Sequence, residues 1–300
     1  MTGLDGCVAI VTGAGRGLGR AHALELAAHG AAVVVNDLGG EMDGSGGDLT
    51  PAQLVVKEIE EAGGRAIANG DDVASWDGGK RMVGQALAAF GRLDVLVNNA
   101  GILRDRLLVN MSENEFDAVV RVHLKGHFVT LRHAAEHWRE RSKAGEQVKS
   151  SVINVSSASG LFGNVGQANY GPSKAGIAAL SRIAAQELQR YGVRVNTIAP
   201  AARTRLTLST PGLDEVLAPP EEGFDEWDPA NVSPVIAWLA MPDCPLTGET
   251  LYVQGGDVRV VRPWSLDDAV RKDGRWTPAE LGKAFADIAP TPFFDFADLT

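Results

Sequence analysis

The sequence contains three side chains that could together transfer a proton: Ser157, Tyr170 and Lys174. Lys174 follows Tyr170 by four residues, so on a helix the two share one face. A phenol has a pKa of about 10, and acting as a base near neutrality requires it to fall by about 2 to 3, a cost of about 3 to 4 kcal/mol. An ammonium about 5 Å away, at an effective dielectric of about 20, supplies about 3 kcal/mol. The spacing predicts that Lys174 lowers the pKa of Tyr170, while Ser157 holds the oxygen that exchanges the proton.

A second candidate site is the glycine-rich turn from Thr12 to Gly19, which follows an apolar run and opens a helical pattern. Glycines there let the backbone turn sharply and approach a pyrophosphate, which rests on the free amides of the helix N-terminus. The turn alone is a weak signal, but an acid, Asp37, ends the next apolar run, as dinucleotide binding requires. The residues of the turn expected to bind the cofactor are Gly13, Arg16, Gly17, Leu18 and Gly19.

The choice between NAD and NADP depends on two residues whose charges favour different cofactors. Asp37 is placed to accept hydrogen bonds from ribose hydroxyls, and its charge would repel a 2′-phosphate. Arg16 would attract that phosphate, but its long side chain can also extend into solvent. We therefore expect NAD, with NADP the less favoured alternative.

Polar and small residues also follow two later apolar runs. Asp72 and Val73 come after one of them and are candidates for contact with adenine, and Asn99, Ala100 and Gly101 follow another. Open α/β sheets bind ligands at these strand ends. Ordinary turn chemistry remains an alternative for either segment, since Asn, Asp and Gly are common turn residues.

The elements that position these residues alternate between strand and helix patterns. This alternation predicts an α/β fold, a single-domain Rossmann-type doubly wound parallel sheet with helices on both faces. Strands are expected at Cys7–Val11, Ala31–Val35, Arg65–Ala68, Leu93–Val97, Val152–Val155, Val193–Ile198 and Glu249–Val253. Helices are expected at Leu18–Ala28, Pro51–Glu61, Asp77–Phe90, from Ser112 to about Arg141, and around Ser173–Tyr191.

Composition narrows the possible partners. The chain of 300 residues has 38 acidic against 28 basic residues, a net charge of -10, which disfavours nucleic acid and anionic membranes as partners. Its two cysteines are too few for a disulfide framework or a thiolate zinc site. We found no leader segment and no apolar run long enough to span a membrane. A cytoplasmic protein is expected.

Together these motifs resemble the short-chain dehydrogenase/reductase family over about residues 5–256. The resemblance is carried by the glycine turn, by Asn98–Gly101, by Ser157, and by Tyr170 and Lys174. It implies an oxidoreductase that transfers a hydride between NAD(P) and a secondary alcohol or ketone. In that family the matching tyrosine is the acid/base, the lysine binds ribose and tunes the tyrosine, and the serine orients the substrate.

A subgroup of the family matches more closely. Residues 35–40, 99–106, 121–124 and 166–170 resemble the (3R)-hydroxyacyl-CoA dehydrogenase modules of peroxisomal multifunctional enzymes type 2 and their bacterial relatives. Two departures from the family pattern stand out. His123 takes a position where many members have an Asn that holds a relay water, and it is a further candidate catalytic residue. Pro200–Thr204 replaces the usual Pro-Gly motif; its matching cofactor positions are Pro200, Ala202 and Thr204.

The resemblance favours oxidation of a 3-hydroxyacyl-CoA to its 3-ketoacyl-CoA, in fatty-acid or sterol side-chain breakdown. Acidic residues between Ala201 and Asp228 count mildly against a CoA thioester, although Arg104, Arg106, Arg203 and Arg205 are candidates to compensate. A dehydrogenase for a free steroid or another secondary alcohol is the alternative. A non-catalytic NAD-binding sensor or scaffold is an alternative of another class, disfavoured because a pure binder needs no acid/base group.

No metal site is expected. His133–His137 matches the H-x-x-E-H pattern of zinc peptidases, but it lies in a helix and lacks a third ligand. Residues 257–300 are expected to form a C-terminal extension, with a helix after Pro278 and aromatic residues at Phe293, Phe294 and Phe296. Because such rings need burial, we expect the extension to pack on another subunit or beside the substrate. A homodimer or homotetramer is expected.

Overall fold

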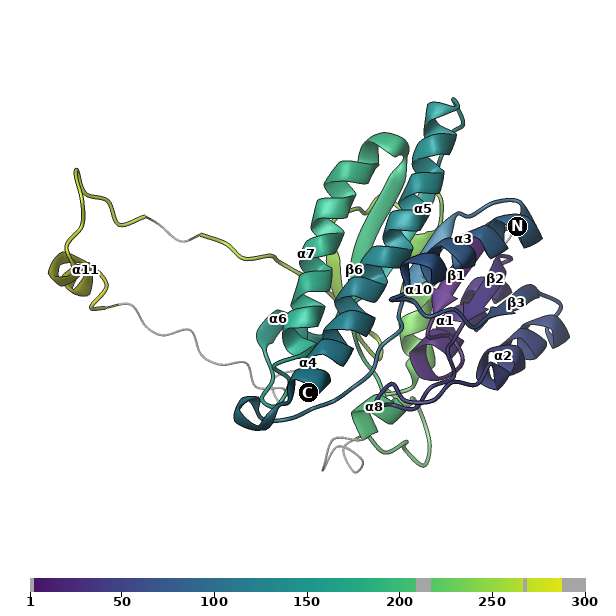
Figure 1. Ribbon diagram of the computed structural model, residues 1–300, viewed down its shortest axis with the longest axis horizontal. Helices are drawn as coiled ribbons and strands as arrows, with labels where there is room; N and C mark the ends of the chain where they lie inside the picture. Colours follow the sequence, from purple (N-terminus) through teal and green to yellow (C-terminus); the bar gives the residue numbers. More distant parts are fainter. Residues whose placement is uncertain (1–2, 209–216, 267–268, 288–300) are drawn as a thin grey trace. The chain divides into compact units, whose positions relative to one another are not determined.

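The computed structural model describes residues 3–208, 217–266 and 269–287 (Figure 1). The chain divides into two compact units, Met1–Val260 and Val261–Thr300, which are described separately. Among the described residues, no helix combines the length and the apolar character needed to cross a lipid bilayer.

The first unit is built on one sheet with the strand order β3-β2-β1-β4-β5-β6-β7-β8. The strand pairings from β1 to β7 are all parallel, as expected for strands joined by helical crossovers. The strands are β1 (Val8–Thr12), β2 (Ala32–Asn36), β3 (Arg65–Asn69), β4 (Val95–Asn98), β5 (Ser150–Val155), β6 (Val193–Ala201), β7 (Thr250–Gln254) and β8 (Asp257–Val261). The predicted doubly wound fold is confirmed.

The strand order reverses direction at β1. From β1 the chain proceeds to β2 and β3 on one side, whereas β4 pairs with the other side of β1. The segments that follow β1 and β4 therefore separate at the carboxyl edge of the sheet. Such a switch point is where open α/β sheets bind their ligands.

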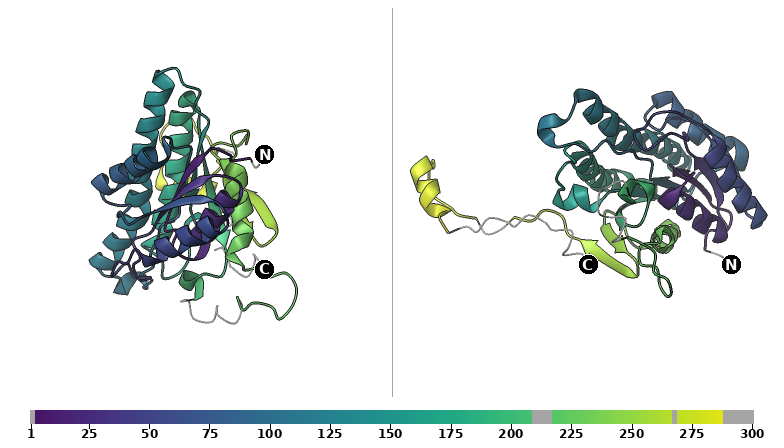
Figure 2. Two further views of the ribbon diagram at one scale, coloured as in Figure 1. Left: turned by 90° about the vertical axis from the view of Figure 1, so that its right-hand side faces the viewer. Right: turned by 90° about the horizontal axis from the view of Figure 1, so that it is seen from below.

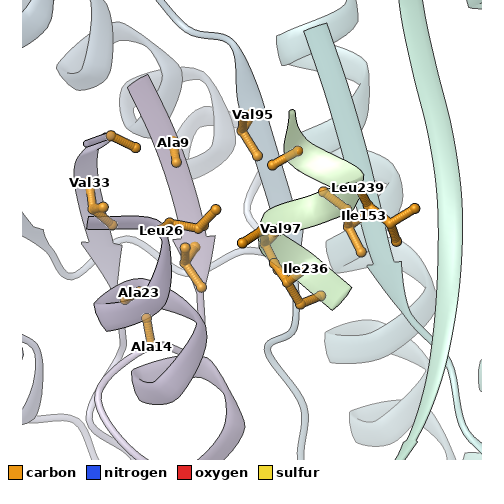
Figure 3. Packing of buried hydrophobic residues seen from close by; sticks show 14 of the residues in the cluster. Ala9, Ala14, Ala23, Leu26, Val33, Val95, Val97, Ile153, Ile236 and Leu239 are labelled. Atoms are coloured by element: carbon orange, nitrogen blue, oxygen red, sulfur yellow. The ribbon is translucent and has the colours of Figure 1, made fainter. Parts of the chain in front are cut away.

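Helices cover both faces of the sheet (Figures 1 and 2). Successive strand residues point to opposite faces, and they divide between two buried apolar clusters. Figure 3 shows the first cluster, in which Ala9 and Val33 lie beside Leu26 of one helix and Val97 lies beside Ile236 of another. On this face lie α1 (Gly17–Ala28), α2 (Thr50–Glu61) and α10 (Ser233–Ala240); on the other lie α3 (Trp76–Phe90), α4 (Glu113–Val120), α5 (Gly126–Lys143) and α7 (Tyr170–Leu188).

Two predicted helices differ from the structure. The long helix expected from Ser112 is interrupted by a π-helical turn, η2 (Arg121–Lys125), which divides it into α4 and α5. The helix expected from Ser173 begins at Tyr170, because the Asn169 side chain accepts a hydrogen bond from the Tyr170 amide at 2.7 Å. Both differences affect residues of the predicted site. The remaining short helices are α6 (Ala158–Phe162), α8 (Arg205–Leu208), η1 (Leu108–Asn110), η3 (Gln189–Tyr191) and η4 (Pro229–Val232).

The C-terminal segment begins within the sheet. Asp257, expected to start the extension, begins β8 beside β7, so the compact unit continues a few residues beyond the expected boundary. In the second unit the helix expected after Pro278 is α11 (Pro278–Ala284), which begins with a capping box between Thr277 and Glu280. Phe293, Phe294 and Phe296 lie outside the described residues, and the packing of the extension stays a prediction.

Candidate active site

A cavity of about 350 Å³ lies at the switch point between β1 and β4. Its walls come from segments that follow β1, β2, β3, β4 and β6, all at the carboxyl edge of the sheet. The structure thus brings together twelve of the residues expected to bind the cofactor: Gly13, Arg16, Gly17, Leu18, Gly19, Asp37, Asp72, Val73, Asn99, Ala100, Gly101 and Thr204.

The glycine turn fits a dinucleotide at two points. A Cβ at Gly19 would lie 2.1 Å from the carbonyl oxygen of Gly13, so only glycine lets the two backbone segments approach this closely. Arg16 is the N-cap of α1 but makes no capping hydrogen bond with its side chain. The first amides of α1 are therefore left for an acceptor such as a phosphate oxygen.

The segment after β4 is tied to the turn after β1. The Thr12 hydroxyl accepts hydrogen bonds from the amides of Asn99 at 3.0 Å and Ala100 at 3.1 Å. The Asn99 side chain donates in return to the carbonyl oxygens of Thr12 at 3.0 Å and Gly13 at 3.1 Å. Asn99 thus orders the cavity wall through the backbone, which is the turn role that its sequence left open.

Asp37 lies at the end of β2 with its carboxylate fixed. One oxygen accepts a hydrogen bond from the Gly15 amide and the other from the Gly39 amide, each at 2.7 Å. Each carboxylate oxygen has a second lone pair, so Asp37 keeps the capacity to accept from a ribose hydroxyl. Arg16 is exposed and forms no ion pair within the part of the chain that the structure describes.

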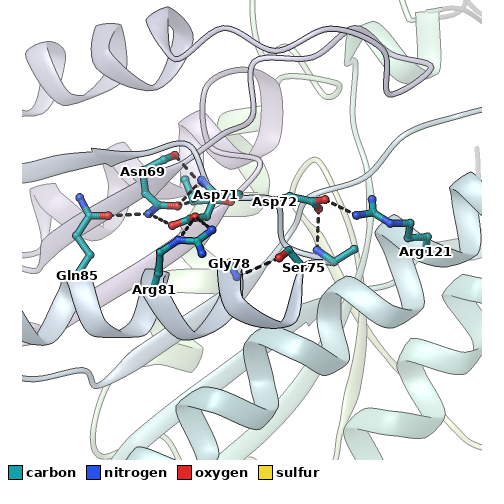
Figure 4. A network of polar contacts seen from close by, with 10 residues as sticks. Asn69, Asp71, Asp72, Ser75, Gly78, Arg81, Gln85 and Arg121 are labelled. Atoms are coloured by element: carbon teal, nitrogen blue, oxygen red, sulfur yellow. Dashed lines mark hydrogen bonds and ion pairs between the residues drawn. The ribbon is translucent and has the colours of Figure 1, made fainter.

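Asp72 is held by a network at the end of β3 (Figure 4). Its carboxylate forms an ion pair with Arg121 of η2 and accepts a hydrogen bond from the Ala74 amide at 2.9 Å. The neighbouring Asp71 is paired with Arg81 and bound by Asn69 at 2.9 Å. These contacts fix the wall of the cavity where Asp72 and Val73 were expected to meet adenine, and they link that wall to the turn that carries His123.

The catalytic group lies at the carboxyl edge of β5. Ser157 follows that strand and caps α6, while Tyr170 and Lys174 lie on the first turn of α7. The Lys174 ammonium is 5.5 Å from the centre of the Tyr170 ring and donates a hydrogen bond to the Val155 carbonyl at 2.6 Å. Ser157 hydrogen bonds to the Tyr170 phenol. The structure therefore assembles the three groups as their spacing suggests.

The electrostatics of this group contradict one expectation. Burial raises the pKa of Tyr170 to about 12, and the hydrogen bond from Ser157 opposes that shift only in part. Burial also lowers the pKa of Lys174 to about 7, so near neutrality its ammonium is only partly charged. The expected lowering of the Tyr170 pKa by Lys174 is therefore not seen in this structure, because desolvation disfavours the charged form of both groups.

His123 lies in the π-helical turn with its ring edge-on to Tyr170, 5.1 Å between ring centres. Its Nε2 is 2.8 Å from the carbonyl oxygen of Ile102, whereas its buried Nδ1 has no partner among the described residues. Burial holds its pKa well below the usual range. A Cβ at Gly101 would lie 2.4 Å from the ring, so glycine is required beside it. In the neutral imidazole, Nδ1 accepts a hydrogen bond when Nε2 donates to the Ile102 carbonyl, and donates one when Nε2 accepts from the Ile102 amide at 3.1 Å.

The segment after β6 completes the site from the other side. Pro200 lies in β6, Ala202 is buried, and Thr204 reaches the cavity. Arg203 is paired with Asp225, and this pair joins the segment to the acidic stretch that follows. Of that stretch, Asp214 and Glu215 lie outside the described residues.

Three residues without an assigned role in the sequence also belong to this region. The Asn169 side chain donates to the carbonyl oxygens of Arg104 at 2.8 Å and Glu115 at 3.2 Å. Gln167 donates to the carboxylate of Asp105 at 2.8 Å. The sequence signal available for them was their place in segments 99–106 and 166–170, which carry the resemblance to the subgroup.

The fold and these groups define the class of protein. The short chain dehydrogenase family model matches residues 7–209, and the chain belongs to this family. It is therefore an oxidoreductase that uses NAD(P) and acts on a small molecule.

Individual relatives are close over most of the chain. The chain is 42% identical to hydroxyacyl-CoA dehydrogenase ChsB1 of Mycobacterium tuberculosis, over 99% of this chain and 94% of that protein. It is 42% identical to peroxisomal multifunctional enzyme type 2 of Mus musculus over 89% of its length, and spans 34% of that longer protein. A crystal structure of a short chain dehydrogenase from Mycobacterium avium superposes with a TM-score of 0.85 at 51% identity, covering 97% of this chain and 99% of that one.

Proposed function

We propose that the protein oxidises a 3-hydroxyacyl-CoA to the 3-ketoacyl-CoA with NAD, in the breakdown of a fatty acid or a sterol side chain. The observation that carries this proposal is the similarity over nearly the whole chain to a protein named hydroxyacyl-CoA dehydrogenase. The assembled Ser157, Tyr170 and Lys174 supply the acid/base chemistry that alcohol oxidation requires.

Each residue has a distinct task in this reaction. A bound NAD supplies the hydride acceptor. Ser157 holds the substrate hydroxyl by a hydrogen bond, and Tyr170 removes its proton. Lys174 donates to the Val155 carbonyl and keeps its ammonium near the phenol, where positive charge favours the phenolate. His123, neutral and with a free Nδ1, is placed to hold a water beside Tyr170.

The preference for NAD rests on Asp37. Because two backbone amides fix its carboxylate at the cavity wall, it cannot easily turn away from a ribose. A 2′-phosphate at that position would meet a negative charge, which disfavours NADP. Arg16 is exposed and can extend into solvent instead.

The substrate is tested by a panel of 3-hydroxyacyl-CoAs of different chain length, free hydroxysteroids and simple secondary alcohols, with NADH formation followed by absorbance. We expect kcat/KM to be highest for a 3-hydroxyacyl-CoA. A higher value for a free steroid would favour the alternative dehydrogenase activity. Absence of turnover with every compound, together with intact NAD binding, would favour a non-catalytic sensor or scaffold.

We also propose that the protein is a cytoplasmic homodimer or homotetramer. An apolar groove of about 610 Å³ runs between α5 and α7, and Phe128 and Ile183 in its walls are exposed. Exposed apolar surface of this kind favours association of subunits. Light scattering of wild type and of Ile183→Glu tests the assembly: we expect the variant to dissociate, and an unchanged mass would exclude this groove as the contact.

A further inference from the structure

The segment after β4 is attached to the loop that leads into α7. The Arg106 amide donates to the Gly166 carbonyl at 2.8 Å, and the backbones of Arg106 and Gln167 form a parallel bridge. The Asn169 side chain holds the Arg104 carbonyl at 2.8 Å. Asp105 lies between these anchors, so its position is fixed relative to Tyr170, which begins α7 immediately after Asn169.

The carboxylate of Asp105 has a neutral partner. It accepts a hydrogen bond from the Gln167 side chain at 2.8 Å, and burial raises its pKa although the residue as a whole is exposed. Gln167 itself is buried. A carboxylate partly removed from water is costly unless it is paired or hydrogen bonded.

The flanking arginines bind elsewhere. Arg106 forms its ion pair with Glu115 at 3.0 Å, and Arg104 donates to the Asp43 carbonyl at 2.7 Å. Asp105 forms no ion pair with another of the described residues. Its negative charge is therefore not neutralised by a neighbouring cation.

Four polar or charged groups surround Tyr170. Ser157 comes from the segment after β5, Lys174 from α7, and His123 from the π-helical turn. Asp105 comes from the segment after β4, and its charge acts on the phenol in the direction that raises the pKa of Tyr170. The sign follows from repulsion, since a phenolate would be a second negative charge in the same region.

We propose that Asp105 is a positioning residue of the catalytic group: oriented by Gln167, its carboxylate places a negative charge near the Tyr170 hydroxyl and sets the pH range in which Tyr170 exchanges its proton. Lys174 and Asp105 then act in opposite directions on the same phenol. Asp105 favours the protonated tyrosine, which is the acid needed for ketone reduction, and Lys174 favours the phenolate needed for alcohol oxidation. The inference rests on the proposed function only in requiring that Tyr170 is the acid/base.

The experiment compares wild type with Asp105→Asn, which removes the charge and keeps an acceptor for Gln167. We expect the rising limb of kcat/KM for alcohol oxidation to move to lower pH by at most about one pH unit, because a negative charge near the phenol is lost and solvent screens the exposed carboxylate. Asp105→Glu restores the charge, so its limb should lie near that of wild type. Glu60→Gln, an exposed acid on α2, removes the same charge far from the catalytic group and should leave the profile unchanged.

A second readout needs no substrate. The chain has three tyrosines, so tyrosine labelled with carbon-13 at Cζ gives few signals, and Tyr170→Phe assigns the one of interest. We expect the Tyr170 signal of Asp105→Asn to begin its titration at lower pH than in wild type, over the range in which circular dichroism stays native. If this shift occurs but no 3-hydroxyacyl-CoA is turned over, the inference holds and the proposed substrate is wrong. If the signal and the pH limb of Asp105→Asn both stay at the wild-type positions, or kcat falls with no shift in either, the inference is wrong.

Discussion

The cofactor cavity and the catalytic group differ in how they treat charge. In the cavity, Asp37 is bound by two backbone amides and Asp72 by Arg121, so each carboxylate has strong partners. In the catalytic group, Lys174 donates to a single carbonyl, and the buried Nδ1 of His123 has no partner among the described residues. The cavity is therefore already shaped for a bound molecule. The catalytic group instead holds ionisable side chains whose charged forms burial disfavours and whose protonation changes during turnover.

Tyr170→Phe is expected to have the largest effect, because it removes the hydroxyl that exchanges the proton with the substrate. We expect kcat to fall by about 100-fold to 10,000-fold, the usual contribution of a general acid/base. NAD affinity should change little, since Tyr170 does not line the cavity of about 350 Å³. The measurements are NADH formation under steady state and a calorimetric titration with NAD.

A matched control is Tyr191→Phe, which removes a phenol in η3, the short turn that follows α7, away from the catalytic group. It should turn over at the wild-type rate. If both variants lost the same share of kcat, the effect would not be specific to the catalytic group. If Tyr170→Phe lost NAD affinity as strongly as kcat, the cofactor cavity and the catalytic group would not be separate in function.

Asp37→Ala tests the cavity in the same way. Hydrogen bonds to a charged group contribute about 1.5 to 3 kcal/mol each, so we expect the affinity for NAD to fall by about 10-fold to 100-fold and that for NADP to fall much less. Asp43→Ala is the control, because Asp43 lies on the same loop and also accepts from a backbone amide, at 2.9 Å, but does not line the cavity. An unchanged ratio of NAD to NADP affinity in Asp37→Ala would contradict the assignment of NAD.

The same contrast explains what the sequence predicted well. Gly13, Gly19 and Asp37 act through backbone geometry close to their own strands, so local pattern was enough to place them. The positions of β1 to β7 were predicted to within a few residues because β-branched runs reach both apolar clusters, whereas β8 was not predicted. In the catalytic group the identities of Ser157, Tyr170 and Lys174 were predicted, but the direction of the Tyr170 pKa was not, because burial is a property of the whole packed site.

Two other features required the tertiary structure. The π-helical turn that carries His123 continues the helical apolar pattern on either side, and its sequence has no proline or glycine to mark it. Asp105 and Gln167 are distant in sequence and meet through the backbone bridge between their segments. No local sequence pattern predicts a contact between residues so far apart in the chain.

The pH dependence of stability tests whether two buried histidines, one on each face of the sheet, stay neutral in the folded protein. His22, 2.9 Å from Ser233 on the side of α1, and His127 on α5 each have a pKa lowered by burial to about 3. An unfolded histidine protonates below about 6.5, so between these values the unfolded state binds more protons and the free energy of unfolding falls as pH is lowered. Each contributes a slope of about 1.4 kcal/mol per pH unit.

The measurement is denaturant unfolding of wild type and His22→Gln at several pH values below neutrality. We expect the variant to lose one such slope, whatever its stability at neutral pH. His29→Gln, a partly exposed histidine at the end of the same helix, should keep the wild-type slope. A wild-type slope in His22→Gln would mean that His22 is protonated in the folded protein.

The smallest effect is expected at Arg104 and Arg205, whose positive charge is available for the phosphates of coenzyme A. Arg104 donates to the backbone carbonyl of Asp43 and Arg205 to that of Gly40, and neither forms an ion pair with a described residue. We expect Arg104→Glu combined with Arg205→Glu to raise KM for a 3-hydroxyacyl-CoA by about 10-fold, with kcat little changed, as exposed charge pairs contribute at most about 1 kcal/mol each. The matching N-acetylcysteamine thioester has no phosphates, so its KM should stay the same. If both KM values rise together, or neither rises, these arginines do not recognise coenzyme A, and the free-steroid alternative gains support.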